Sequence, residues 1–273
     1  MTRSVVAVDT TVFYTSIARL VDGDPTPRCG YLHAADVTSH HAPAQEMRRH
    51  VDLAAQVVSA ITKSRFGVPD LVVMVRPYLG TMTADPSAQR RVSVWWEIVR
   101  QLDVAGVPVG EVSLLSVQKS ALGSAAFGKK GTDALAQWVA DNWTRWTPPL
   151  YDGKPDPRYR ATTLAVAAAG ALAAGFPAAQ LPASDDVVNA LRGGMNLPAG
   201  FRLPDTAPRA TGTKKRLTRD EYISERLVEI ASLPITELET WKPRSPELKR
   251  ALKARFAKDE ERRVEASIMG GEL

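Results

Sequence analysis

The first third of the chain carries strand-like hydrophobic runs. Residues 4–8 are a short β-branched run that ends at Asp9 and two threonines, which is typical of a buried strand followed by a loop. Apolar positions at 13–20 and 31–37 predict the next strands of an antiparallel meander. The run DLVVMV at 70–75 is almost wholly apolar, so we expect an interior strand of a sheet that is covered on both faces.

Helical spacing separates and follows these strands. Segments 45–66 and 87–105 carry apolar residues every three or four positions, and a glycine follows each of them directly. The elements expected next are a strand at 109–117, a helix from Thr132 and Asp133 to about 143, a proline-rich loop at 147–160 and a small-residue helix at 161–175. This order predicts an α/β domain over the first two-thirds of the chain.

The remainder of the chain has a different composition. Pro, Gly and basic residues dominate 177–216 and predict an irregular arm. Thr218 and Glu221 form a capping box at the start of a helix, and Ser245 opens a last helix. We therefore expect an α/β domain at 1–178, a basic Pro/Gly-rich linker or arm at 179–217 and a C-terminal helical extension at 218–273.

Charge and cysteine content narrow the classes of partner and compartment. Lys and Arg number 35 against 30 Asp and Glu, which gives a net charge of +5 and permits a polyanionic partner without demanding one. Cys29 is the single cysteine, so an internal disulfide and a cysteine-based zinc cluster are both excluded. The start of the chain does not resemble a signal peptide, and the alanine-rich run at 161–176 is too short for a bilayer span. We expect a cytoplasmic protein with no membrane partner.

Five segments, in order, resemble the RuvC family of Holliday junction resolvases in the RNase H-like superfamily. They are VVAVDTT at 5–11, DLVVMV at 70–75, the helix and strand from ADPSAQRR to EVSLLSV at 84–117, VQKSALGSAAFGKKGTDALAQWV at 117–139 and ATTLAVAAAGALAAG at 161–175. The resemblance covers about residues 4–175 and implies a mixed five-stranded RNase H-like sheet flanked by helices. The C-terminal hundred residues match no family that we can name.

In that family, several carboxylates hold divalent ions that activate water for phosphodiester hydrolysis. Asp9 matches the first carboxylate and is the one candidate catalytic residue and metal ligand. Val75, followed by Arg76, stands where the family has a glutamate, and Tyr159 and Thr162 stand where it has two aspartates. We therefore expect no cofactor, with Mg²⁺ needed only if the chain is an active nuclease. Asp9 alternatively caps the turn that follows its strand.

The chain has basic residues at positions where the RuvC family, which it resembles, also has them. Lys119, Lys129 and Lys130 match the place where the family carries lysines near the scissile phosphate, and Arg76 adds a cation. The resemblance predicts that these four residues contact DNA, although a solvated loop is the alternative for the lysines. The segment GSAAFGKK at 123–130 nearly matches a phosphate-binding Walker loop, but Lys130 replaces the metal-binding Ser or Thr.

Other polar and aromatic features have simpler interpretations. His40 and His41 lack further ligands, so a zinc site is not expected. Four tryptophans have helical spacings that are more typical of core residues than of base-stacking platforms: Trp95, Trp96, Trp138 and Trp143. The basic stretch at 209–219 is either an arm that contacts phosphates or a linker.

Three hypotheses follow. The first is a RuvC-like protein that binds branched or junction DNA by shape and phosphate contacts, without cleavage and without a small-molecule cofactor. A four-way junction has two-fold symmetric strands, so the resemblance also implies a homodimer. The second is an active metal-dependent endonuclease in which Asp70, Asp85, Asp152 or Asp156 replaces the missing ligands. The third is a phage or mobile-element structural protein that kept the fold and lost nucleic-acid binding.

Overall fold

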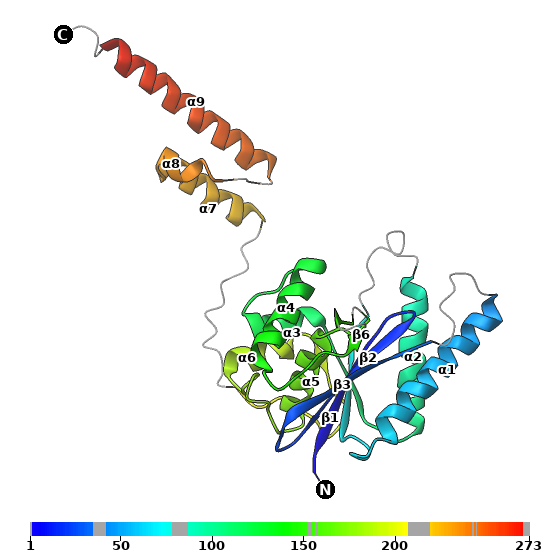
Figure 1. Ribbon diagram of the computed structural model, residues 1–273. Coiled ribbons are helices and arrows are strands. Elements are labelled where there is room, and N and C mark those ends of the chain that lie inside the picture. The colour runs from blue at the N-terminus through cyan, green and yellow to red at the C-terminus, as the bar shows by residue number, and fades with distance from the viewer. Residues whose placement is uncertain are drawn as a thin grey trace. The chain divides into compact units, whose positions relative to one another are not determined.

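The computed structural model describes residues 2–34, 42–77, 87–151, 154–156, 158–206, 219–241, 243 and 245–269. The chain divides into two compact units, Met1–Ala207 and Pro208–Leu273 (Figure 1). Each unit has its own hydrophobic core. They are therefore described separately.

A six-stranded mixed sheet organises the first unit. Its strands are β1 (Ser4–Thr10), β2 (Tyr14–Val21), β3 (Asp24–His33), β4 (Leu71–Val75), β5 (Val109–Val112) and β8 (Met195–Asn196). Their order across the sheet is β3-β2-β1-β4-β5-β8, with β1, β4 and β5 parallel to one another and β2, β3 and β8 antiparallel to their neighbours. The predicted α/β class with a mixed sheet flanked by helices is confirmed, but β8 adds a sixth strand to the five expected.

Alternate residues of the central strands face two helical layers (Figure 1). On β1, Val6 and Val8 pack against α1 (Pro43–Thr62) and α2 (Ala88–Val104), whereas Val5 and Ala7 pack beneath α5 (Thr162–Ala173). The helices α3 (Leu114–Leu122), α4 (Lys129–Asn142) and α6 (Asp185–Arg192) surround α5 on its side of the sheet. This arrangement explains why the DLVVMV run lacks polar residues, since both of its faces are covered.

Helix α5 lies unusually close to the sheet. All twelve of its residues are buried, and half of them are alanine. A Cβ atom added to Gly170 would lie 2.6 Å from Val5 Cγ1 and 2.7 Å from Val73 Cγ2, so only glycine fits at this crossing. The predicted small-residue helix is confirmed, and its small side chains set the depth at which it packs.

The predicted strand at 109–117 is wrong in its second half. Strand β5 ends at Val112 and α3 begins at Leu114, after Ser113 adopts an extended conformation. An apolar run of this length fits both a buried strand and a buried helix, and the burial of consecutive residues 116–118 shows that the helix applies here. The proline-rich loop at 147–160 also contains a short hairpin of β6 (Leu150–Tyr151) and β7 (Lys154–Pro155).

The segment predicted as a linker at 179–217 is structured in its first part. Helix α6 begins after Ser184, whose hydroxyl accepts a hydrogen bond from the Val187 amide, and β8 pairs with β5. Residues 179–206 therefore belong to the first compact unit. The Pro and Gly residues that suggested a linker delimit these short elements. Residues 207–218, which include Thr218 of the expected capping box and most of the basic stretch at 209–219, lie outside the described residues.

The second unit is helical, as predicted. It comprises α7 (Arg219–Ser232), α8 (Ile235–Leu238) and α9 (Pro246–Met269), around a core of Ile230, Leu238, Leu248 and Leu252. Across the described parts of both units, every helix is either too short or too polar to cross a lipid bilayer.

Candidate nucleic-acid interface

Asp9 lies near the carboxyl end of β1, on the face that α5 covers. Its backbone partner on β2 is Ser16, and the pairing of Val8 with Met74 places Val75 beside it on β4. Like Val5 and Ala7, Asp9 and Val75 occupy the positions that face α5. The first turn of α5 and the residues before it therefore complete the surroundings of Asp9.

Arg160 compensates the charge of Asp9. Its Nη1 lies 3.2 Å from each carboxylate oxygen of Asp9, and its backbone N–H donates to Ser16 Oγ at 2.9 Å. The Asp9 side chain is 4% exposed and that of Arg160 is 45% exposed. Burial raises the pKa of Asp9 above its ordinary value, and the charges of Arg160 and Arg91, with the Arg160 hydrogen bond, offset only part of this rise.

The other positions around Asp9 provide no further carboxylate. Val75 is apolar, Thr162 is buried in the first turn of α5, and burial raises the pKa of the Tyr159 phenol well above its ordinary value, so that it remains protonated. Hard divalent cations require several oxygen ligands, preferably anionic. Within the described residues, no group of three or more His, Cys, Asp or Glu side chains is placed to hold a metal ion. This set of donors does not fit a two-metal site.

The carboxylates proposed as replacements do not join Asp9. Asp156 is buried and is held by Arg158, whose Nη2 lies 2.6 Å from its Oδ2; hydrogen bonds from Arg158 and Tyr31 lower the pKa of Asp156. Asp70 precedes β4 and accepts from the Ser4 amide at 2.6 Å, so it lies at the opposite end of β1 from Asp9. Asp85 and Asp152 lie outside the described residues.

The predicted lysines flank the connection between α3 and α4. Lys119 is exposed near the end of α3, and Lys129 and Lys130 are exposed in the first turn of α4. Residues 123–128, which we call the α3–α4 loop, join the two helices. Gln118 and Gly128, the chain neighbours of Lys119 and Lys129, both line a pocket that also contains Arg76. Of the four predicted cations, Arg76 lines this pocket, Lys119 and Lys129 each follow a lining residue in the chain, and Lys130 follows Lys129.

This pocket, which we call the loop pocket, has a volume of about 400 Å³ and lies between the α3–α4 loop and the carboxyl ends of β4 and β5. Its lining consists of Arg76, Pro77, Ser113, Leu114, Leu115, Gln118, Ala126, Phe127, Gly128 and Thr132. Arg76 is anchored there because its Nη2 lies 2.9 Å from Glu111 Oε1, and its side chain remains 39% exposed. Unlike the lysines, Arg76 therefore has an acidic partner.

Buried polar contacts fix the α3–α4 loop. Gln118 is 2% exposed, and its Oε1 accepts a hydrogen bond from the Ala126 amide at 3.0 Å. A Cβ atom on Gly131 would clash with the Ala126 carbonyl and with the Gln118 amide group. The loop therefore has one well-determined path, at the end of which the Phe127 side chain is 71% exposed.

Sequence reasoning missed Arg160 and Phe127. Arg160 is separated from Asp9 by 151 positions, and its relation to Asp9 depends on the packing of α5. Phe127 lies within the Walker-like segment, in which glycines and lysines are the residues expected to contact phosphate. That segment follows helix α3 directly, whereas a Walker loop follows a strand, so the geometry does not support a nucleotide site of that kind.

A further polar cluster lies on the first turns of α1 and α2. Glu46 accepts from His50 Nε2 at 3.0 Å and pairs with Arg49, whose guanidinium stacks 4.9 Å from the centre of the Phe13 ring. Burial lowers the pKa of His50, and the neighbouring Arg49 and Arg90 act in the same direction, against Glu46. His50 is therefore largely neutral at pH 7.

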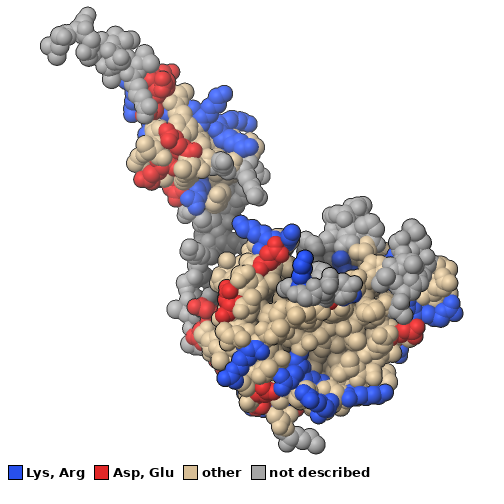
Figure 2. Space-filling view, in the orientation of Figure 1, with Lys and Arg blue, Asp and Glu red and all other residues tan. Residues whose placement is uncertain are grey.

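The remaining predictions have mixed outcomes. Trp95 and Trp143 are core residues, 6% and 3% exposed, but Trp96 is 60% exposed. His40 and His41 lie outside the described residues. On the face seen in Figure 2, Lys and Arg are interspersed with Asp and Glu and do not form a continuous basic stripe.

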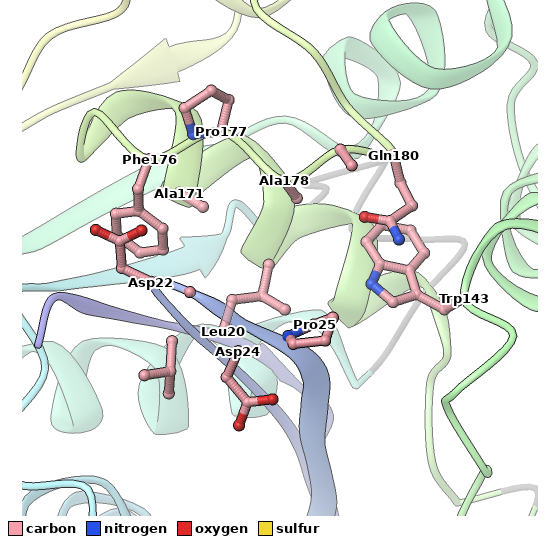
Figure 3. A pocket seen from close by; sticks show the side chains of 13 residues that line it. Leu20, Asp22, Asp24, Pro25, Trp143, Ala171, Phe176, Pro177, Ala178 and Gln180 are labelled. Carbon is pink, nitrogen blue, oxygen red and sulfur yellow. The ribbon is translucent and has the colours of Figure 1, made fainter.

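A second hollow, of about 290 Å³, lies at the carboxyl end of β2, beside Leu20 and Val21 (Figure 3). Phe176, Trp143 and Leu20 contribute apolar lining, and its charged lining residues are Asp22 and Asp24. Asp22 pairs with Arg3 at 2.7 Å. An acidic lining repels phosphate, so this hollow does not compete with the loop pocket for nucleic acid.

No protein-family model matches the chain, and no curated protein matches its sequence. Among solved structures, T. thermophilus RuvC in complex with a Holliday junction substrate is 18% identical with a TM-score of 0.44, over 60% of this chain and 90% of that one. A further Thermus thermophilus RuvC structure has 18% identity and a TM-score of 0.43, over 63% and 97% of the chains. YeaZ from Pseudomonas aeruginosa, at 18% identity, has a TM-score of 0.24 over 46% and 55%.

Proposed function

We propose that this protein binds branched DNA through the carboxyl edge of its sheet and does not hydrolyse it. The observation that carries the proposal is the pairing of Asp9 with Arg160, beside Val75. A carboxylate that is already compensated by an arginine has little remaining attraction for a divalent cation. A nuclease of the two-metal type needs several such groups to be available.

The lysines support binding in the absence of cutting. Lys119, Lys129 and Lys130 are exposed and flank a fixed loop, which suits contacts with successive phosphates of one backbone. Such contacts position a nucleic acid but carry no sequence information, so recognition of DNA shape is the expected mode. A two-fold symmetric junction would be matched by two copies of the chain, and the proposal therefore includes a homodimer on the DNA.

The test is a binding and cleavage assay with a labelled four-way junction. The protein is incubated with the junction and with a linear duplex of equal length over a range of salt, first without metal and then with Mg²⁺ or Mn²⁺. We expect salt-dependent binding that favours the junction and no cleavage with either metal. Light scattering of the complex reports whether one or two copies bind.

Two results would overturn the proposal. Metal-dependent cleavage that disappears in Asp9→Asn would show an active nuclease. Absence of binding to either DNA at low salt would indicate a protein that uses the fold for another interaction.

A further inference from the structure

The loop pocket joins an exposed aromatic ring to an apolar floor. Phe127 is 71% exposed, and Leu114, Leu115 and Ala126 line the cavity beside it. Ser113, Gln118 and Thr132 add polar groups to the same lining. A flat ring with polar edges matches this composition, because its faces need apolar contact and its edges need hydrogen bonds.

The charge around the pocket selects a ligand that is also anionic. Lys129 and Lys130 follow Gly128 directly, Lys119 follows Gln118, and Arg76 forms part of the lining. Among the described residues that line the pocket none is acidic, and the nearby Glu111 is already paired with Arg76. An aromatic ring carried on a phosphate backbone satisfies both the apolar and the cationic features.

We propose that the loop pocket takes an unpaired nucleobase of branched DNA, with Phe127 as the stacking platform and the lysines on the flanking phosphates. This inference rests on the proposed function and goes beyond it, because recognition by phosphate contacts alone needs no base to leave the helix. Bases inside a regular duplex are stacked on both faces and cannot reach the pocket. Branch points, bulges and single strands offer bases that can.

The fixed path of the loop favours binding. The Gln118–Ala126 hydrogen bond and the close contact at Gly131 hold Phe127 in place before DNA arrives. Ordering of a flexible loop would otherwise oppose binding. Loss of the ring should therefore weaken binding of an unpaired base by roughly 10-fold, within the range found for base–aromatic stacking.

The experiment uses the full chain and three DNAs with the same total number of nucleotides: a duplex, a duplex with a two-nucleotide bulge containing 2-aminopurine, and a four-way junction. Wild type is compared with Phe127→Ala, Phe127→Leu and Phe127→Tyr. Trp96→Ala is the matched control, because it removes another exposed aromatic ring, which lies on α2 outside the pocket.

We expect wild type to bind the bulged DNA about 10-fold more tightly than the duplex and to change the 2-aminopurine emission. Phe127→Ala and Phe127→Leu should lose both effects while keeping the salt slope, whereas Phe127→Tyr and Trp96→Ala should keep both. Circular dichroism confirms that each variant is folded.

The outcomes separate the two proposals. If wild type binds junction and duplex with steep salt dependence but does not prefer the bulge, the pocket proposal fails and the proposed function stands. If Phe127→Ala binds the bulge as wild type does, the pocket proposal fails as well. If wild type binds none of the DNAs at low salt, both fail.

Discussion

The surroundings of Asp9 and the α3–α4 loop differ in almost every physical property, although both lie at the carboxyl edge of the same parallel strands. Asp9 is buried, and Arg160 compensates its charge. The α3–α4 loop presents an exposed ring and is flanked by exposed lysines. The first arrangement is suited to stability and the second to binding a polyanion, so the two regions should respond to mutation in opposite ways.

The proposed function assigns nucleic-acid binding to the second region and no catalytic role to the first. Holding a backbone needs exposed cations, which tolerate imprecise placement. Hydrolysing it needs several carboxylates within metal-binding distance, and among the described residues Asp9 has no such neighbour. Binding is therefore the more robust of the two capacities.

The largest effect is expected from the loop side. The triple variant Lys119→Ala, Lys129→Ala and Lys130→Ala should bind a four-way junction about 500-fold more weakly at 0.1 M salt, because three phosphate contacts are lost at about 0.9 in salt slope each. Filter binding or fluorescence anisotropy at several salt concentrations measures both quantities. Lys63→Ala is the control, because that lysine follows α1 and is exposed. An unchanged salt slope in the triple variant would disprove phosphate contact by these lysines.

The next effect tests the packing that supports Asp9. Gly170→Ala should lower the free energy of unfolding by about 2 kcal/mol, because the added methyl overlaps Val5 and Val73. Urea denaturation measures this change. Gly193→Ala is the matched control, since its Cβ would have no atom within 4 Å and its φ of −73° suits alanine. Equal stability of the two variants would contradict the close packing of α5.

Removal of the compensating charge should have a smaller effect. Arg160→Ala leaves Asp9 buried beside fewer cations, but the cost is limited to about 1 kcal/mol because Arg160 is partly solvated and Asp9 can take up a proton. Arg160→Lys should recover part of the loss. Chemical denaturation at pH 7 measures both variants. If Arg160→Ala had the same free energy of unfolding as wild type, the ion pair would contribute nothing to stability.

The smallest effect concerns the pH dependence of stability. Because burial raises the folded-state pKa of Asp9, the folded chain keeps a proton that the unfolded chain releases above the ordinary value of 3.8. Wild-type stability therefore falls as pH rises from that value through the raised folded pKa. The asparagine side chain in Asp9→Asn does not titrate. The stability of this variant relative to wild type should therefore increase with pH and then level off.

Urea denaturation at pH 4, 5.5 and 7 gives this difference for Asp9→Asn. The variant should also bind a four-way junction at least as well as wild type, since no metal ligand is lost. A relative stability that decreases with pH would contradict the burial effect, and weaker DNA binding would place Asp9 in the interface.

The sequence predicted those features that depend on local pattern. The strand before Asp9, the apolar strand β4 and the small-residue helix α5 all follow from hydrophobic spacing, and the resemblance placed Val75 beside Asp9. The boundary between β5 and α3 could not be predicted, because a continuous apolar run fits both periods.

Features that depend on tertiary contacts were not predictable. Arg160 lies in a proline-rich loop, and nothing local indicates that it reaches Asp9. The path of the loop before Phe127 depends on a hydrogen bond that the Ala126 amide donates to the buried Gln118 side chain, and sequence alone does not distinguish a buried glutamine from a surface one. The packing of residues 179–206 was missed because prolines that delimit short elements have the same composition as prolines in a linker.

The depth at which α5 sits makes the helix a firm reference for the residues that precede it. Gly170 lets the helix approach the Val5 and Val73 side chains closely, so the seating of α5 is set by contacts far along the helix from residues 159–162. Attempts to engineer new chemistry beside Asp9 should therefore begin with substitutions in that turn.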